Sequence, residues 1–127
     1  MSAPFKTGRH REVSRAGGFD PETLETLFSV LGADRMRRLF QVSRLEFAEA
    51  IDRLNRAFEA QDLERSHDEA HALRGAAANI GAVTLADAVA NYEMRLRDRS
   101  FCPQLLNAIR AAIALANDAL AKLDPVG

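Results

Sequence analysis

The chain has 127 residues, of which 17 are lysine or arginine and 18 are aspartate or glutamate, so its formal net charge is −1 at pH 7. A chain of this length is expected to form one soluble domain that buries about two-thirds of its surface without disulfides or metal. The balanced charge argues against nucleic acid and anionic membranes as partners, the lone Cys102 excludes an internal disulfide framework, and no apolar run reaches the roughly 18 residues of a membrane-spanning helix.

Residues 1–18 are predicted to form a flexible tail. They carry only two sizeable apolar side chains, Phe5 and Val13, and they end in Gly17-Gly18. Such a stretch cannot bury enough apolar surface to offset the entropy lost on ordering it. Its basic residues could form an arm for a partner, but a solvated tail is the preferred interpretation.

The folded domain is predicted to span residues 19–127 and to begin with a short helix. Asp20 can cap this helix, Pro21 suits the first helical position, and Gly32 suits its C-terminal stop. A longer helix is expected over about 34–61. Large apolar side chains recur there on one stripe, which indicates a core-facing surface. They are Met36, Leu39, Phe40, Phe47, Ile51, Leu54 and Phe58.

Three further helices complete the predicted domain. One spans about 62–80 and ends at Gly81, the next begins near a possible capping box at residues 84–87 (Thr-Leu-Ala-Asp), and the last begins at Pro103. The short link after Gly81 favours antiparallel neighbours. No segment shows strand-like alternation, so the sequence predicts an all-α fold, an antiparallel four-helix up-and-down bundle with a short additional N-terminal helix.

The helix expected over 62–80 contains the most informative segment, EAHALRGAAANIG at residues 69–81. On a helical wheel its apolar residues cluster in one arc, and His71 lies well over 90° from the centre of that arc. The imidazole should therefore point outward. Six residues within two turns of His71 belong to the same polar and small surface: Glu64, His67, Asp68, Arg74, Gly75 and Ala78.

The chemistry of this surface suggests a nucleophile, His71, beside a cation, Arg74, that can bind an anionic group. An exposed imidazole is largely neutral at pH 7, which leaves one ring nitrogen with a lone pair for attack. Arg74 can place a fixed positive charge beside any anionic group that His71 acquires. Gly75 costs about 1 kcal/mol relative to alanine inside a helix, so its presence suggests that something approaches the backbone closely, and Ala78 extends the bare surface.

The same segment resembles the histidine phosphotransfer (HPt) domain family. The run Ala70-His71-Ala72-Leu73-Arg74-Gly75, followed by Asn79-Ile80-Gly81-Ala82, is similar to the family pattern His-x-Leu-Lys-Gly and then Gly-Ala. Weaker matches extend the resemblance over about residues 19–97 and include Tyr92-Glu93. Arg74 stands where the family has lysine, and Ala76 and Ala77 stand where it often has serine. These departures bear on partner preference and transfer rate.

By this resemblance His71 is the phosphoacceptor and Arg74 stabilises the phosphate. A response-regulator receiver domain is expected to dock over His67, Asp68, Gly75, Ala78 and Asn79, and a hybrid histidine kinase is a second candidate partner. The implied function is the relay of a phosphoryl group between His71 and the aspartate of receiver domains in a two-component phosphorelay. The chain would act as a cytoplasmic, monomeric phosphocarrier without an ATP-binding domain rather than as an enzyme. No cofactor or metal is expected on this chain, and Mg²⁺ is expected on the partner receiver domain.

Three other functions can be weighed against this one. His67 and His71 have a spacing that can bind zinc, but a third ligand is missing, because His10 lies in the predicted tail and Cys102 is alone. A histidine kinase would need a nucleotide-binding domain with a Gly-rich phosphate loop, which the sequence lacks. A helical adaptor that docks receiver or kinase domains without carrying phosphate stays open. It predicts that His71 can be changed without loss of activity.

Overall fold

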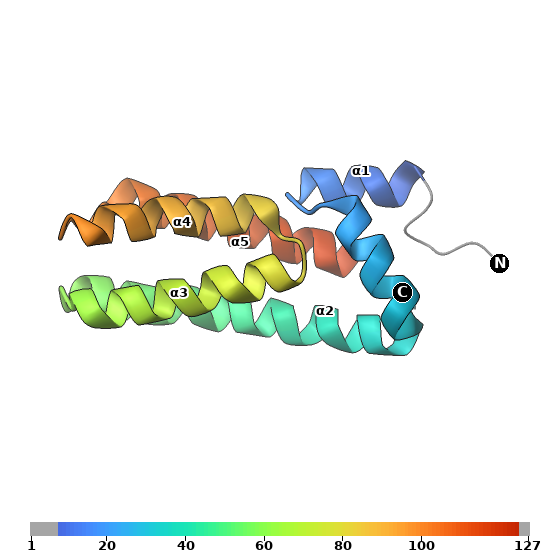
Figure 1. Ribbon diagram of the computed structural model, residues 1–127, viewed down its shortest axis with the longest axis horizontal. Helices are drawn as coiled ribbons and strands as arrows, with labels where there is room; N and C mark the ends of the chain where they lie inside the picture. The colour runs from blue at the N-terminus through green and yellow to red at the C-terminus, as the bar shows by residue number, and fades with distance from the viewer. Residues whose placement is uncertain (1–7, 125–127) are drawn as a thin grey trace.

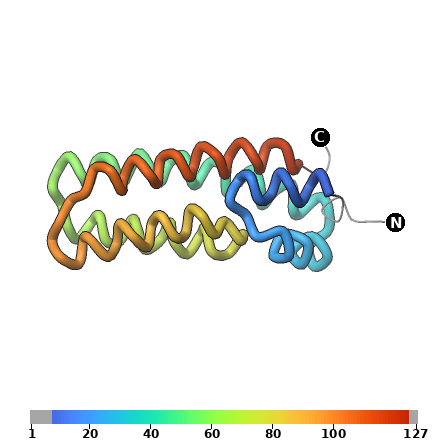
Figure 2. Tube along the Cα trace, turned by 90° about the horizontal axis from the view of Figure 1, so that it is seen from above, coloured from blue at the N-terminus to red at the C-terminus, as the bar shows by residue number. Residues whose placement is uncertain are grey.

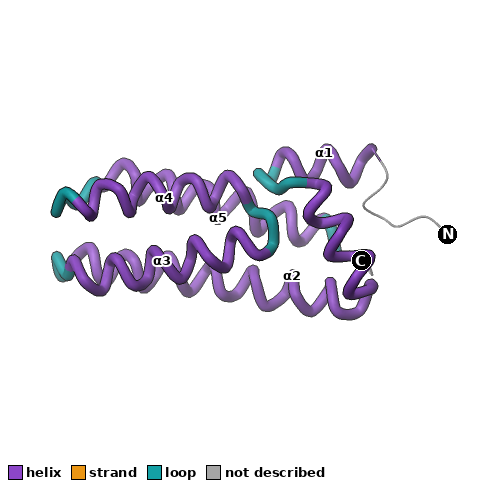
Figure 3. Tube along the Cα trace, in the orientation of Figure 1, coloured by secondary structure: helices purple, strands orange, loops and turns teal. Residues whose placement is uncertain are grey.

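The computed structural model describes residues 8–124, and helices make up most of them (Figure 1). The helices are α1 (Gly8–Ala16), α2 (Pro21–Glu59), α3 (Leu63–Asn79), α4 (Val83–Arg97) and α5 (Pro103–Lys122). Short turns connect them, and residues 8–124 contain no strand (Figure 3). The predicted all-α class is therefore confirmed.

Four helical segments form the bundle, each antiparallel to its neighbours in the chain (Figure 1). The long part of α2 packs against α3, α3 packs against α4, α4 packs against α5, and α5 closes the ring against α2. Apolar residues at helical spacing fill the centre because each helix turns one stripe inward. The largest fully buried side chains are Leu24, Met36, Phe40, Phe47, Leu54, Leu73, Ile80, Leu85, Tyr92, Leu96 and Ile109. The predicted up-and-down bundle is confirmed.

The short leading helix predicted before Gly32 is the first part of α2. Gly32 has φ 78° and ψ 172°, which lies outside the helical region and is easily reached only by glycine. Asp20 caps this segment by accepting a hydrogen bond from the backbone N–H of Glu22, and Pro21 occupies the first turn. Figure 1 shows the first turns of α2 crossing the end of the bundle, whereas the rest of α2 runs along it.

The prediction of a flexible tail over residues 1–18 is wrong for residues 8–18, and so is the domain boundary at residue 19. Residues 8–16 form α1, which packs against α2 and α5 (Figure 2). Arg11 pairs with Glu25 of α2. Gly17 permits a close approach to α5, because a Cβ at this position would overlap the Cβ of Ala119. The segment docks through the small residues Ser14 and Gly17, which are buried, together with Val13, which packs against the core. Residues 1–7 lie outside the described part of the chain.

Gly81 ends α3 as the sequence predicts. Its φ of 77° lies in the left-handed region. The N–H of Gly81 donates to the carbonyl of Ala78, and the N–H of Ala82 donates to the carbonyl of Ala77 at 2.8 Å. This pair of bonds is the Schellman arrangement, which satisfies carbonyl groups at the end of the helix.

Two backbone hydrogen bonds join the α3–α4 link to the segment that connects α1 and α2. The backbone N–H of Asp20 donates to the carbonyl of Gly81 at 2.9 Å, and the N–H of Thr84 donates to the carbonyl of Gly18 at 3.1 Å. The capping box expected at residues 84–87 is wrong, because α4 begins at Val83 and has no side-chain cap. Backbone bonds to a distant segment replace the cap. The end of α3 is thereby held in place.

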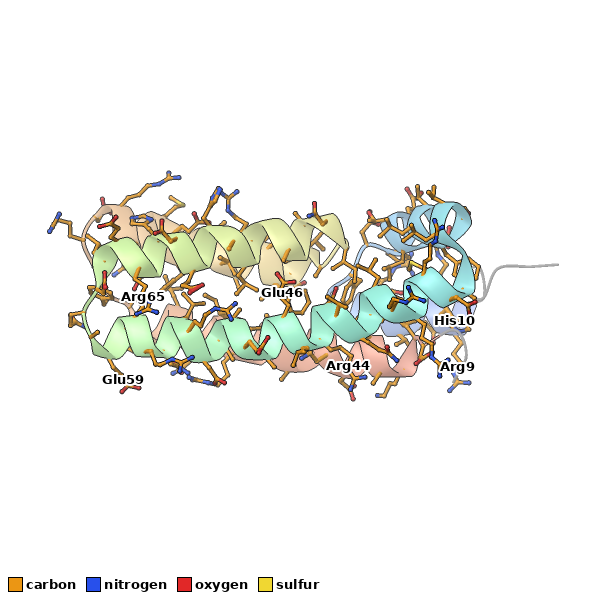
Figure 4. All side chains as sticks on the ribbon, turned by 90° about the horizontal axis from the view of Figure 1, so that it is seen from below. Arg9, His10, Arg44, Glu46, Glu59 and Arg65 are labelled. Atoms are coloured by element: carbon orange, nitrogen blue, oxygen red, sulfur yellow. The ribbon has the colours of Figure 1, made fainter. Side chains whose placement is uncertain are left out.

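Charged side chains of both signs lie at the surface of the bundle, among them Arg44, Glu46 and Glu59 (Figure 4). Glu59 and Arg65 lie at the end that holds the α2–α3 turn, and Arg9 and His10 lie at the opposite end. Positive and negative side chains therefore share the surface, as the balanced composition leads one to expect. Within residues 8–124, no helix combines the length and the apolar character needed to cross a bilayer.

Candidate functional site

His71 lies near the middle of α3 and projects into solvent. Asp62 caps this helix by accepting a hydrogen bond from the backbone N–H of Arg65. Ala70 and Leu73 are buried on the core side, whereas the His71 side chain is 76% exposed. The outward orientation expected from the helical wheel is confirmed.

Arg74 lies one turn after His71 and is bound to α4. Its Nε donates to Oε1 of Glu93 at 2.5 Å, and the Glu93 side chain is only 8% exposed. A carboxylate buried to this extent is costly unless it is paired and hydrogen-bonded. Arg74 supplies that partner, so its guanidinium is fixed at the α3–α4 seam instead of moving freely in solvent.

His71, Arg74 and Glu93 form one cluster, which we call the His–Arg–Glu triad. Nη2 of Arg74 lies 3.4 Å from Nδ1 of His71, and Oε2 of Glu93 lies 3.9 Å from the same nitrogen. The first distance is long for a hydrogen bond and the second exceeds one. Both contacts concern Nδ1, which leaves Nε2 as the ring nitrogen open to a reacting partner.

The surface beside the triad combines small residues with short polar ones. Gly75, Ala78, Asn79 and Asp68 are exposed, and His67 is partly buried. A Cβ added to Gly75 would meet nothing within 4 Å, so packing within residues 8–124 does not require glycine there. The docking residues predicted from the sequence thus belong to one helix and lie at the surface, with His67 partly covered.

Glu93 is the member of the triad to which the sequence reasoning assigned no role. It appeared only in the weak family match Tyr92-Glu93. One signal could have found it. His71 and Arg74 lie ten and seven residues before Gly81, and Glu93 lies twelve residues after it. Residues at similar distances from the link of an antiparallel hairpin lie level, so an acid beside the core residue Tyr92 was a candidate partner.

Two buried hydroxyls belong to the interior rather than to the exposed site. Neither Ser66 Oγ nor the Tyr92 hydroxyl has a hydrogen-bond partner among residues 8–124. Burial raises the pKa of Tyr92 above its ordinary value of 10.0, and the nearby Ser66 hydroxyl opposes part of this shift. The two groups approach each other without reaching hydrogen-bond geometry, so we assign them no part in the chemistry of the triad.

The zinc alternative gains no support from the described residues. Among residues 8–124, no three His, Cys, Asp or Glu side chains come close enough together to hold a metal ion. A zinc site needs at least three protein ligands. His67 and His71 are both on α3, and no third donor joins them in this part of the chain.

Comparison with known proteins agrees with this geometry. Residues 38–119 match the model of the Hpt domain family, and this range includes all three residues of the triad. No curated protein sequence matches the chain. The fold is similar to the crystal structure of histidine-containing phosphotransfer protein B (HptB) from Pseudomonas aeruginosa PAO1, with a TM-score of 0.81 and 23% sequence identity over 87% of this chain and 96% of that one. At this identity the likeness establishes the fold alone.

Proposed function

Because this chain belongs to the Hpt domain family, whose members transfer phosphoryl groups in phosphorelays, we propose that His71 exchanges a phosphoryl group with the aspartate of response-regulator receiver domains. The observation that carries the proposal is an exposed imidazole beside a positioned guanidinium, with open space above Gly75 on the same helix. The arrangement provides a nucleophile, a positive charge and room for a partner. The proposal covers the receiver of a two-component system and, as a second partner, a hybrid histidine kinase.

The transfer would proceed by in-line attack on phosphorus. The Nε2 lone pair of His71 forms the N–P bond while the bond from phosphorus to the aspartyl oxygen breaks, and the electron pair stays on the aspartate. Arg74 has Nε engaged by Glu93, but its Nη groups can still bind phosphoryl oxygens. Mg²⁺ held by the receiver would neutralise further charge there. The reverse steps would return the group to a receiver.

A carrier of this kind ends each half-reaction covalently modified, so we class the chain as a phosphocarrier and not as an enzyme. We further propose that it works in the cytoplasm as a monomer, without nucleic acid or membrane as a partner. The receiver would dock over the exposed surface of α3 at Asp68, Gly75, Ala78 and Asn79, with His67 at its edge. A transient interface of this kind can be small.

Labelling of single variants tests the assignment of His71. The purified chain is mixed with a receiver carrying labelled aspartyl phosphate, and acid-labile label on the chain is measured. His71→Gln should take up no label while its circular dichroism and its affinity for the receiver stay close to those of the parent. His67→Gln is the matched control and should remain labelled. Label retained by His71→Gln would reject the assignment, and a parent chain that binds receivers without taking label would favour the adaptor alternative.

A further inference from the structure

The contact between Arg74 and His71 restricts where the imidazole can carry its proton. A guanidinium has only donors and stays protonated in proteins. Nδ1 of His71 lies 3.4 Å from Nη2 of Arg74, so a favourable contact requires Nδ1 to be the acceptor. In a neutral ring the proton then sits on Nε2. This tautomer has no lone pair on the nitrogen that must attack phosphorus.

The reactive tautomer has the opposite arrangement, with the proton on Nδ1 and the lone pair on Nε2. A proton on Nδ1 would face the N–H groups of Arg74, which is unfavourable. It would also face Oε2 of Glu93, which lies 3.9 Å from Nδ1. A movement of about 1 Å would bring this pair to ordinary hydrogen-bond distance. Arg74 and Glu93 therefore favour different tautomers of the same ring.

We propose that resting His71 is held in the less reactive tautomer by Arg74, and that the incoming phosphoryl group activates the ring by drawing Arg74 away from Nδ1. The inference rests on the function proposed above. The negative oxygens of the phosphoryl group compete with a neutral nitrogen for Nη2, and the charged acceptor binds more strongly. Once Nη2 has moved, Oε2 of Glu93 is the remaining partner of Nδ1.

The proton steps balance through water. Nε2 gives its proton to solvent and Nδ1 takes one from solvent, so the charge of the ring does not change; the 76% exposure of the side chain permits this exchange. The Nε2 lone pair then forms the N–P bond as the aspartyl P–O bond breaks. The Nδ1 proton, bonded to Glu93, leaves the phosphorylated ring positively charged and therefore a good leaving group for the return transfer. Glu93 is a positioning residue in this scheme.

A purely structural role for the Arg74–Glu93 pair makes a different prediction. In that case the pair joins α3 to α4, and its removal changes stability without changing the tautomer of His71. Nuclear magnetic resonance of histidine labelled with ¹⁵N separates the two possibilities, because protonated and unprotonated ring nitrogens have well-separated shifts. The measurement uses the full chain at about pH 8, where an imidazole is neutral.

The expected spectrum of the resting parent chain shows His71 mainly with the proton on Nε2. In Arg74→Gln the equilibrium should shift until the Nδ1-protonated form predominates, and in Glu93→Gln it should stay with Nε2. Arg74→Met provides a second variant if Arg74→Gln folds poorly. Phosphorylation of the parent with phosphoramidate should give a ring protonated on Nδ1. His67 is the internal control, and its tautomer should not respond to either substitution.

Two outcomes would overturn the proposal: a resting parent chain with His71 already protonated mainly on Nδ1, or an equilibrium that is the same in the parent and both Arg74 variants. Both are measured without phosphate. Failure of this inference is therefore distinct from failure of the proposed function, which would appear as an absence of label on His71 in the transfer assay.

Discussion

Replacing Gly75 with alanine should stabilise the fold and weaken receiver docking, two effects of opposite sign at one position. Gly75 lies inside α3, and a Cβ built there has nothing within 4 Å. No steric cost offsets the gain in helix propensity, so we expect about 1 kcal/mol of added stability. For a chain of this size the corresponding rise in Tm is roughly 3–6 °C.

Urea unfolding followed by circular dichroism measures the first effect. With a slope of about 1–3 kcal/mol/M, a gain of about 1 kcal/mol moves the midpoint up by roughly 0.3–1 M without changing the slope. Gly17→Ala is the matched control, because its new Cβ would overlap Ala119 and must lower the midpoint. A midpoint for Gly75→Ala at or below that of the parent would refute the argument that α3 has no internal need for glycine.

Calorimetric titration with a receiver identified by the labelling assay measures the second effect. Affinity should fall from Gly75→Ala to Gly75→Leu, because a larger side chain increasingly obstructs an approach to the backbone of α3. The circular dichroism of both variants should match or exceed that of the parent. Equal affinity for the parent and Gly75→Leu would show that receivers do not dock over this part of α3.

Arg74→Ala should shorten the lifetime of the phosphorylated chain in a pulse-chase assay, a measurement that does not depend on the tautomer of the resting ring. It should also lower unfolding stability by about 1–3 kcal/mol because Glu93 loses its partner; an unchanged lifetime would contradict a role of Arg74 in stabilising the phosphate. Gly17→Ala should lower the free energy of unfolding by about 1–3 kcal/mol, measured from urea midpoints, because the added Cβ overpacks against Ala119. An unchanged midpoint would mean that α1 does not pack against α5 as described. Burial raises the pKa of Tyr92 above 10.0, so the unfolded chain loses this proton first and stability should fall as pH rises through that value. Tyr92→Phe should show a shallower loss in unfolding measurements from about pH 8 to 11, and identical pH profiles would argue against the shift.

The bundle could be predicted from the sequence because its determinants are local. Apolar residues recur at helical spacing, Asp20 and Pro21 mark the start of α2, and Gly81 marks the end of α3. The segment before residue 19 could not be predicted by the same criterion. The position of α1 depends on the close approach of Gly17 to Ala119 of α5. A pattern of apolar residues gives no information on such a contact between distant segments.

The candidate site was predictable where it depends on one helix and unpredictable where it depends on two. The outward orientation of His71 and the exposure of Gly75 follow from the periodicity of α3. The pairing of Arg74 with Glu93 depends on how α3 and α4 align, and a helical wheel contains no information on that alignment. Thr84 is a second example. The sequence predicts a capping box at residues 84–87, but the N–H of Thr84 donates instead to the carbonyl of Gly18, a contact that the local sequence cannot predict.

The bonds that join Asp20 to Gly81 and Thr84 to Gly18 have a practical consequence for anyone shortening this protein. A truncated version starting at residue 19, where the apolar pattern begins, would discard the carbonyl of Gly18 and leave the first turn of α4 without that acceptor. The pairing of Arg74 with Glu93 depends on how α3 and α4 align, so we expect the loss of this bond at the start of α4 to weaken that pairing. We therefore expect truncation at residue 19 to lower the reactivity of His71, although the truncated chain keeps most of its helix content.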